Sequence, residues 1–571
     1  MGIPGGIPTT RKQCGSTLSA GVSTSTVQKA LNRCALAHPI TRSSPGDGGY
    51  VLLGAGTFSL SNLEIPSNVT LRGSGADQTI ISETGTSGSA IQMIGKEPQL
   101  SNSVSITSGS TAGSTSLVVS SAIEFVKGQF MYLSQLNAPP ITNVGGDGTC
   151  TWCDGFSDGG TRNQGQIVQI TGISGRTITF TPKLYVPLTN APEAIPFSAT
   201  IRYAGIEDLQ LYANNTGQSY NIRMNTCEFC WVKGIEGNYV DGNGNHVQID
   251  FGFRDEVRDS YFSDAYRHTS GSTENEIQLQ FKTSNVLIEN NILERMQTAV
   301  NLQDGSVGNV VAYNYMEGGL DQNTLLLGGT GGTYTHGPNP DYNLWEGNVL
   351  PYIVFDSVWG SSSYQVAYRN WSKGTGRACY PLNGRSTVTS GCSYQTQAAR
   401  SLDVYALSTQ DSFVANVLGS AEQSALSLTK TSNILWNRTR AWDTVAYTKS
   451  FGYGTIGDSG RSSIDSANAY NTAYFSGNYD NIAGAADTNC PSSPPASFYL
   501  ASQPSWWRSG VKWPAVGCDV TGGGGPGGHS SIHSSNSAMD CFYNVMGGTD
   551  GGTGGPYKFN ANSCYSRGRY R

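Results

Sequence analysis

"VAYNYM", residues 311–316, places an asparagine between two tyrosines inside an apolar segment. Strands disfavour asparagine, yet it returns in the same place in "WEGNVL" (345–350), "AYRNWS" (367–372), "FVANVL" (413–418) and "ILWNRT" (434–439). Alignment on this position gives Asn238, Asn291, Asn314, Asn348, Asn370, Asn416, Asn437 and Asn478, with Ser260 in the same place in "VRDSYF". The shortest intervals are 21 to 23 residues. A repeat of this length is typical of one coil of a parallel β-solenoid.

The solenoid explains why the asparagine recurs. At a bend of each coil, its side-chain amide can hydrogen-bond to the amides above and below at the strand spacing of about 4.8 Å. Such a ladder would satisfy buried amides that otherwise cost about 1–3 kcal/mol each. We therefore expect these residues to be structural and not catalytic.

A second strand precedes most of the asparagines, as in "HVQIDFG" (246–252), "EIQLQFK" (276–282), "AVNLQDG" (299–305) and "PYIVFDS" (351–357). Alternation along such a strand sends one set of side chains to the core and the other outward. The inward set is predicted to be Val247, Ile249, Phe251, Ile277, Leu279 and Phe281. The outward set is predicted to form a polar column of Gln248, Asp250, Gln278, Gln280, Asn301, Gln303 and Asp356.

Composition excludes several classes of protein. The 571 residues carry a net charge of −6, so there is no basic surface of the kind that binds nucleic acid. No uncharged apolar segment is long enough for a membrane span. The start, "MGIPGGIP", lacks the apolar core of a signal peptide, and we expect the mature part of a secreted, extracellular protein.

The twelve cysteines fall into close couples, which is typical of disulfides formed in an oxidising compartment. A zinc site built from the two CxxC couples is the alternative, although no histidine stands at ligand spacing. The predicted couples are Cys14/Cys34, Cys150/Cys153, Cys227/Cys230, Cys379/Cys392, Cys490/Cys518 and Cys541/Cys564.

Two N-terminal segments, "TVQKALNRCALAHPI" (26–40) and "GDGGYVLLGAGTFSLSNLEIPSNVTLRGSGADQTII" (46–81), resemble the opening of right-handed parallel β-helix proteins of the pectate-lyase-like superfamily. The resemblance continues through "SNVLIENNILERM" (284–296) and "HGPNPDYNLWEGNV" (336–349) and covers most of residues 26–480. It implies an all-β fold, a right-handed parallel β-helix with an N-terminal capping helix. It does not choose an activity, because the superfamily includes polysaccharide lyases, glycoside hydrolases, esterases and adhesins.

Four parts of the chain are predicted. Residues 1–103 form the N-terminal cap and first coils, and residues 104–200, which interrupt the repeat, read as a small antiparallel β insertion. Residues 201–484 form the main β-helix, and residues 485–571, rich in glycine, form a looped C-terminal cap.

Catalytic candidates lie beside the long insertions at 263–275, 330–341 and 373–394. Asp304 and Asp356 end strands two coils apart, about 10 Å, and inverting glycosidases separate their two carboxyls by about 6.5–9.5 Å. An Asp that closes a coil can equally be a turn residue that caps backbone N–H groups. The further catalytic candidates are His336 and Asp341 on the intervening loop, Asp250, and Asp264, Arg267 and His268 on the first insertion.

A lyase would instead need a cation beside the uronate carboxylate and a base for the proton α to it. Arg254, Arg267, Lys282 and Tyr334 are candidates for these roles, and Trp359, Gln280 and Gln303 for sugar binding. The sequence therefore predicts a monomeric polysaccharide-cleaving enzyme, with hydrolysis preferred, and a uronate lyase or a non-catalytic adhesin as alternatives. We expect no cofactor, with Ca²⁺ open only to the lyase alternative.

Overall fold

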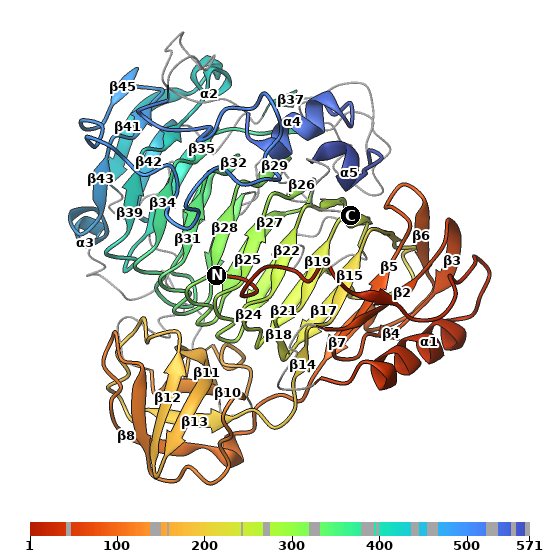
Figure 1. Cartoon of the computed structure of the whole chain (residues 1–571). Helices are drawn as coiled ribbons and strands as arrows, with labels where there is room; N and C mark the ends of the chain where they lie inside the picture. Colours follow the sequence, from red (N-terminus) through yellow and green to blue (C-terminus); the bar gives the residue numbers. More distant parts are fainter. Residues whose placement is uncertain are drawn as a thin grey trace.

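The computed structural model describes residues 1–40, 47–137, 150–156, 159–240, 244–266, 275–318, 332–378, 393–394, 399–435, 445–453, 466–520, 535–549 and 556–565. Three long sheets form the body of the protein, and successive coils add one strand to sheet 1, then to sheet 2, then to sheet 3 (Figure 1). Neighbouring strands in these sheets are parallel, apart from the pair β44 and β45. The predicted right-handed parallel β-helix is thereby confirmed.

Sheet 1 contains, in spatial order, β1 (Lys12–Gln13), β2 (Gly49–Leu52), β5 (Val69–Arg72), β15 (Gly205–Glu207), β19 (Trp231–Lys233), β22 (Glu256–Arg258), β25 (Leu287–Glu289), β28 (Val310–Ala312), β31 (Leu344–Glu346), β34 (Val366–Tyr368), β39 (Ser412–Val414) and β43 (Tyr474–Ser476). Sheet 2 contains β3 (Gly56–Leu60), β6 (Thr79–Glu83), β16 (Gln210–Tyr212), β20 (Glu236–Asn238), β23 (Tyr261–Ser263), β26 (Ile292–Glu294), β29 (Tyr315–Glu317), β32 (Val349–Leu350), β35 (Trp371–Ser372), β40 (Val417–Leu418), β44 (Tyr479–Asp480) and β45 (Ala485–Ala486). Sheet 3 contains β4 (Leu63–Glu64), β7 (Ser89–Ile94), β17 (Tyr220–Asn225), β21 (Asn245–Asp250), β24 (Asn275–Gln280), β27 (Thr298–Gln303), β30 (Thr333–His336), β33 (Ile353–Phe355), β38 (Arg400–Tyr405), β42 (Val445–Tyr453) and β41 (Thr429–Leu435).

The corner between sheets 1 and 2 holds the asparagine ladder. Between β28 and β29 it consists of Tyr313, with φ of 56°, and Asn314. The side-chain amide of Asn314 donates to Oδ1 of Asn348 at 3.0 Å, and the same oxygen accepts the backbone N–H of Asn314. Amide-to-amide bonds of 2.8 to 3.0 Å continue this pattern along the axis through Asn291, Asn314, Asn348, Asn370, Asn416 and Asn478.

One predicted member does not belong to this ladder. Asn238 is part of β20, and the ladder position of its coil is taken by Ile235, whose N–H donates to Ser260. Asn416 bonds directly to Asn478, so no coil separates them, and Asn437 lies outside the described residues.

A second ladder, which the sequence did not reveal, lies at the corner between sheets 3 and 1. The amide of Asn309 donates to Oδ1 of Asn343 at 3.1 Å. In other coils an aspartate takes the same position: Asp255 accepts the N–H of Cys230, and Asp411 accepts the N–H of Gln365, each at 2.8 Å. The mixture of residue types hides the repeat.

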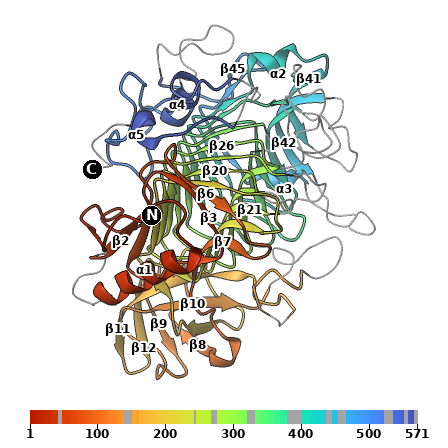
Figure 2. The ribbon, with the colours of Figure 1, turned by 90° about the vertical axis from the view of Figure 1, so that its right-hand side faces the viewer.

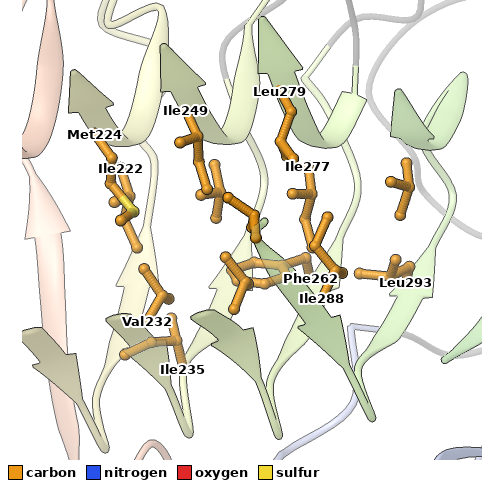
Figure 3. Close-up of a cluster of buried hydrophobic side chains, with 14 of the residues drawn as sticks. Ile222, Met224, Val232, Ile235, Ile249, Phe262, Ile277, Leu279, Ile288 and Leu293 are labelled. Carbon is orange, nitrogen blue, oxygen red and sulfur yellow. The ribbon is translucent and has the colours of Figure 1, made fainter. Parts of the chain in front are cut away.

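The core is a column of aliphatic side chains enclosed by the three sheets. Ile249 and Ile277, with Met224, face Val232, Phe262 and Ile288 across the interior (Figure 3). Val247, Ile249, Ile277 and Leu279 point inward as predicted, but Phe251 and Phe281 do not. Both have positive φ, 51° and 54°, which breaks the alternation and turns their rings toward the insertion.

The insertion is a closed antiparallel barrel between β7 and β14 (Ile201–Arg202). Its strands, in order around the barrel, are β10 (Phe130–Gln135), β11 (Gln164–Ser174), β12 (Thr177–Thr181), β9 (Ser116–Val119), β8 (Val104–Ser108) and β13 (Glu193–Pro196). A short 3₁₀ helix, η1 (Leu100–Asn102), precedes the barrel, which packs on the corner between sheets 3 and 1 (Figure 1).

Helices cover both ends of the core. α1 (Thr24–Ala37), capped by Ser23, lies across the first coils and buries Val27 and Leu31 (Figure 2). At the other end, α3 (Ser466–Asn471) places Ala469 and Tyr470 on the core. Further short elements are α2 (Ala421–Ala425) and the pair β36 (Arg377–Ala378) and β37 (Ser393–Tyr394).

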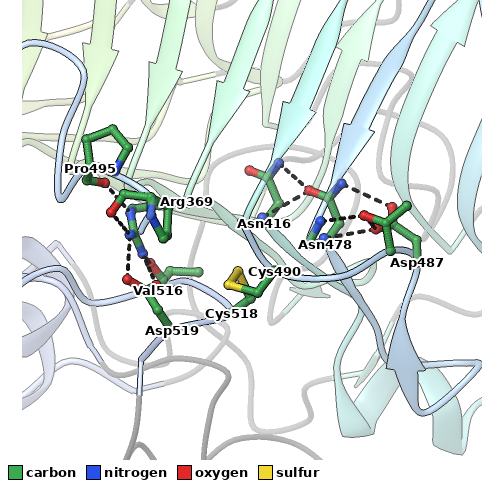
Figure 4. The surroundings of a disulfide bond; sticks show 12 residues. Arg369, Asn416, Asn478, Asp487, Cys490, Pro495, Val516, Cys518 and Asp519 are labelled. Atoms are coloured by element: carbon green, nitrogen blue, oxygen red, sulfur yellow. Dashed lines mark hydrogen bonds and ion pairs between the residues drawn. A yellow bond between two sulfur atoms is a disulfide. The ribbon is translucent and has the colours of Figure 1, made fainter. Parts of the chain in front are cut away.

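The C-terminal segment runs back along sheets 1 and 2 toward the first coils. It carries α4 (Ser537–Asn544) and α5 (Ala561–Cys564), and the amide of Asn560 donates to Asp77 at 2.8 Å. Near the Cys490–Cys518 disulfide, Arg369 of the β-helix binds Asp519 at 2.6 Å and the carbonyl of Val516 at 2.9 Å (Figure 4).

Four of the predicted cysteine couples are disulfides: Cys14–Cys34, Cys150–Cys153, Cys490–Cys518 and Cys541–Cys564. They are compatible with an extracellular protein. The prediction was wrong for Cys227 in β18 (Cys227–Glu228) and Cys230, which are free. Their thiols lie 3.2 Å from the carbonyl of Met93 and 3.6 Å from that of Ile201, and therefore each has a backbone partner in the core. Cys379 and Cys392 lie outside the described residues.

Candidate functional site

Three polar side chains meet on the outer face of sheet 3. Asp356, which follows β33, accepts the hydroxyl of Tyr334 at 2.5 Å, and Nδ1 of His336 lies 2.7 Å from the same carboxylate oxygen. Tyr334 and His336 come from β30, and their rings stack with centroids 5.1 Å apart. Burial, and then the charge of Asp356, raise the pKa of Tyr334. Of the three, His336 is the most exposed, with 12% of its side chain accessible against none of Asp356.

The triad continues the polar column predicted from the sequence. In register, Asp250 neighbours Gln280, and Gln303 neighbours His336. Gln280 donates to Gln303, which joins the two halves of the column. Five predicted site residues from five coils therefore stand in one row on the outer face of sheet 3: Asp250, Gln280, Gln303, His336 and Asp356.

Asp304 lies beside this row and not in it. It follows β27 with φ of 52°, at the corner toward the barrel, and accepts Gln280 at 3.2 Å. Its side chain is fully buried, and burial raises its pKa well above the usual value while Lys282 opposes that shift. Lys282 is buried too, with its ammonium 4.7 Å from the ring of Tyr132 in the barrel. A pair with Asp356 would require Asp304 to stand in the outward row, in register with His336. Gln303 occupies that position, and Asp304 is one residue beyond it.

Three other predicted residues lie at corners. Asp264 forms an ion pair of 2.7 Å with Arg295, and both side chains are almost inaccessible. Asp341 accepts the N–H of Ser363 at 2.8 Å, and burial raises its pKa to about 6. Arg254 borders Phe253 and Tyr185 beneath the barrel. Arg267 and His268 are outside the described residues.

A second carboxylate, not predicted, faces outward on the coil after Asp356. Asp403 of β38 neighbours Val354 and accepts Arg400 at 2.6 Å and the hydroxyl of Tyr447 at 3.3 Å. Burial raises its pKa, and Arg400 opposes the shift. The alternation in "SLDVY" (401–405) could have placed Asp403 outward.

Trp359, predicted as a sugar platform, is half-buried three residues after Asp356. Its ring meets that of Trp152 from the barrel, with centroids 5.9 Å apart and planes at 76°. The sequence did not connect these two residues, because Trp152 stands outside the repeat.

Two further observations bear on cofactors and location. Within the described residues, His, Cys, Asp and Glu form no group able to hold a metal ion. In the same part of the chain, no helix has the length and hydropathy needed to span a membrane.

No protein-family model matches the sequence, and comparison with curated proteins finds no match. Among solved structures, this protein is similar to the tailspike protein gp49 from Pseudomonas phage LKA1. The TM-score is 0.48 and the identity 12%, over 70% of this chain and 58% of the tailspike. It is also similar to an alginate lyase from Paenibacillus sp., with a TM-score of 0.34 and 11% identity over 70% of this chain and 94% of the lyase. A third is the catalytic domain of a GH87 α-1,3-glucanase, with a TM-score of 0.35 and 10% identity over 84% of this chain and 70% of the glucanase. At these TM-scores, the likenesses carry no argument about activity.

Proposed function

We propose that this protein is an extracellular enzyme that cleaves a uronic-acid polysaccharide by β-elimination on the outer face of sheet 3. The proposal rests on one observation: the buried carboxylate of Asp356 binds Nδ1 of His336, the member of the triad that reaches solvent. A carboxylate in this position orients an imidazole and fixes its tautomer. His336 is therefore suited to proton transfer with its other nitrogen.

Elimination requires a single base next to the substrate. Nε2 of His336 would take the proton on the carbon α to the uronate carboxylate, the electron pair would form the new carbon–carbon double bond, and the bond to the glycosidic oxygen would break. The protonated imidazole can return the proton to that leaving oxygen. Tyr334, whose hydroxyl donates to Asp356, positions the carboxylate.

The negative charge that develops on the uronate needs a cation. On the coil after Asp356, Arg400 lies 5.0 Å from the ring of Tyr352, is 1% exposed and is held by Asp403. We propose that the positive charge of Arg400 acts on the uronate through the electric field of the site and not by direct contact.

Hydrolysis is the second candidate, because Asp356 and Asp403 have a suitable separation. Asp403 neighbours Val354. A strand spacing of about 4.8 Å and a rise of about 3.3 Å per residue then place the α-carbons of Asp356 and Asp403 about 8 Å apart. Inverting pairs span about 6.5–9.5 Å between their carboxyls. We rank hydrolysis second because Asp356 and Asp403 are 0% and 2% exposed, and both are hydrogen-bonded to internal donors.

The test compares acidic and neutral polymers. The protein is incubated with polygalacturonate, alginate, dextran and xylan, and reducing ends and the ultraviolet absorbance of unsaturated uronates are both followed. Elimination gives both signals on an acidic polymer. Reducing ends without absorbance would establish hydrolysis instead, and binding with neither signal would establish the adhesin alternative.

Variants assign the roles. His336→Ala and Asp356→Asn are each expected to lower turnover about 100-fold or more, since a positioned proton-transfer group contributes about 10²–10⁴-fold. The control is Asp540→Asn, which removes an ion pair with Arg508 in the C-terminal segment. Full activity of His336→Ala would remove His336 from the mechanism.

A further inference from the structure

We propose that Trp152 and Trp359 form one glycan-binding site, shared by the barrel and the β-helix, that holds the polysaccharide beside His336. The inference rests on the proposed function for the identity of the ligand. The barrel would then take part in substrate binding, a role that the sequence repeat of the β-helix does not indicate.

The two indoles make an apolar corner that is open to solvent. Their ring centroids are 5.9 Å apart, and their planes meet at 76°. Trp152 is 40% exposed, although it is among the largest apolar side chains of the protein. A pyranose ring presents a flat face of C–H groups, so it can stack on one indole while its edge contacts the other. Trp359 follows Asp356 by three residues, so their α-carbons are at most about 11 Å apart.

The loop that carries Trp152 is held in place on several sides. The disulfide Cys150–Cys153 closes it, and both cysteines are buried. Asp154 accepts the N–H of Phe156 at 3.0 Å and that of Arg162 at 3.2 Å. An indole fixed in this way loses little conformational entropy when a sugar binds.

Gly155 sets the distance between this loop and the β-helix. Its φ is 80°, and a Cβ at this position would lie 2.6 Å from the ring of Phe251 and 2.9 Å from that of Phe281. The absence of a side chain therefore lets the loop rest directly on these two rings. Phe251 and Phe281, which their positive φ turns toward the barrel, thereby support this loop.

The barrel does not need the Trp152–Trp359 contact in order to dock. Phe130, Tyr132 and Ile167 of the barrel already pack against Phe251 and Phe253 in a separate buried cluster. Trp152 lies outside that cluster and keeps 40% of its surface accessible. An aromatic pair beyond the docking surface, with one indole exposed and the other half-buried, offers an apolar contact for a ligand.

The experiment measures retardation of the full-length protein in native gels that contain polygalacturonate, alginate, dextran or xylan. Trp152→Ala and Trp359→Ala are each expected to weaken binding about 10-fold, the size of a strong aromatic contact. Combining them should weaken binding by less than the product of the two single effects, because they share one ligand. The control is Tyr364→Ala, which removes another exposed ring, stacked on Tyr342.

A second set of variants tests the loop. Cys150→Ser with Cys153→Ser should weaken binding while Trp152 is still present, because the loop is no longer closed. Thermal unfolding of every variant separates binding from stability. If Trp152→Ala lowers the unfolding temperature but leaves the retardation unchanged, the pair is only a structural contact and the inference is overturned. Retardation of the wild-type protein by none of the four polymers would overturn it as well.

The outcomes also separate this inference from the proposed function. Elimination that is unaffected by Trp152→Ala would leave the catalytic proposal standing and refute the glycan-binding site. Retardation that depends on both tryptophans, without cleavage of any polymer, would support the glycan-binding site and refute the catalytic proposal.

Discussion

Replacement of Asn348 by alanine tests the ladder that shapes the coils. The Asn348 side chain makes four hydrogen bonds, to the backbone N–H and amide of Asn314, the amide oxygen of Asn370 and the carbonyl of Val311, at 2.9 to 3.0 Å. Truncation leaves the N–H of Asn314 buried without its acceptor, at a cost of about 1–3 kcal/mol. The other three bonds contribute about 0.5–1.5 kcal/mol each. We therefore expect Asn348→Ala to lower the free energy of unfolding by about 2.5–7.5 kcal/mol.

Asn348→Asp sharpens the test because it keeps the shape of the side chain. The aspartate can still accept from Asn314, but its second oxygen faces the amide oxygen of Asn370 and the carbonyl of Val311, where the asparagine donates. A buried charge against two acceptors costs more than a cavity of similar size. We expect Asn348→Asp to be less stable than Asn348→Ala.

Urea-induced unfolding followed by circular dichroism measures both effects. The control is Asn562→Ala, at an exposed position of α5, where surface substitutions change stability by about 0.5 kcal/mol or less. If Asn348→Ala is as stable as the control, or Asn348→Asp is the more stable of the two ladder variants, the reasoning about the ladder is refuted.

Three further predictions concern groups outside the ladder. Burial raises the pKa of Asp341 to about 6, so the stability that its protonated form contributes is lost as pH rises from about 4 to about 6. Asp341→Asn should therefore raise the thermal unfolding temperature, relative to the wild type, more at pH values above 6 than below 4. An equal shift at both pH values would contradict this. Because Arg369 binds Asp519 and nearby carbonyls, Arg369→Ala should speed protease cleavage of the C-terminal segment, and unchanged cleavage would show that other contacts hold it. Alkylation in denaturant without reductant should label Cys227 and Cys230, as read by peptide mass spectrometry, whereas a disulfide between them would block both.

The sequence was sufficient for the β-helix because one corner repeats with the same residue type. The spacing of Asn291, Asn314 and Asn348 indicates the corner, and apolar and polar residues alternate regularly in the strands that precede them. Ladder positions occupied by other residues, such as Ile235, carry no such signal. The pattern therefore predicts Asn238 at a position that Ile235, three residues earlier, occupies.

The site was predictable where strands are regular and not where they turn. The outward row of Gln280, Gln303 and His336 follows from alternation along each strand. Asp304 stands just after a strand with a positive φ, and no pattern in the sequence reports that change of direction. Asp403 follows the longest insertion, where coils can no longer be counted from the spacing of asparagines.

The corner between sheets 1 and 2 has the same length in coil after coil, with two residues between β28 and β29 and two between β34 and β35. The passage from sheet 2 to sheet 3 varies, from residues 351–352 between β32 and β33 to 373–399 between β35 and β38. Evolution can therefore insert or delete sequence at one side of the molecule without disturbing the frame that carries it. Grafting of foreign loops should succeed at that variable passage and fail at the two-residue bend.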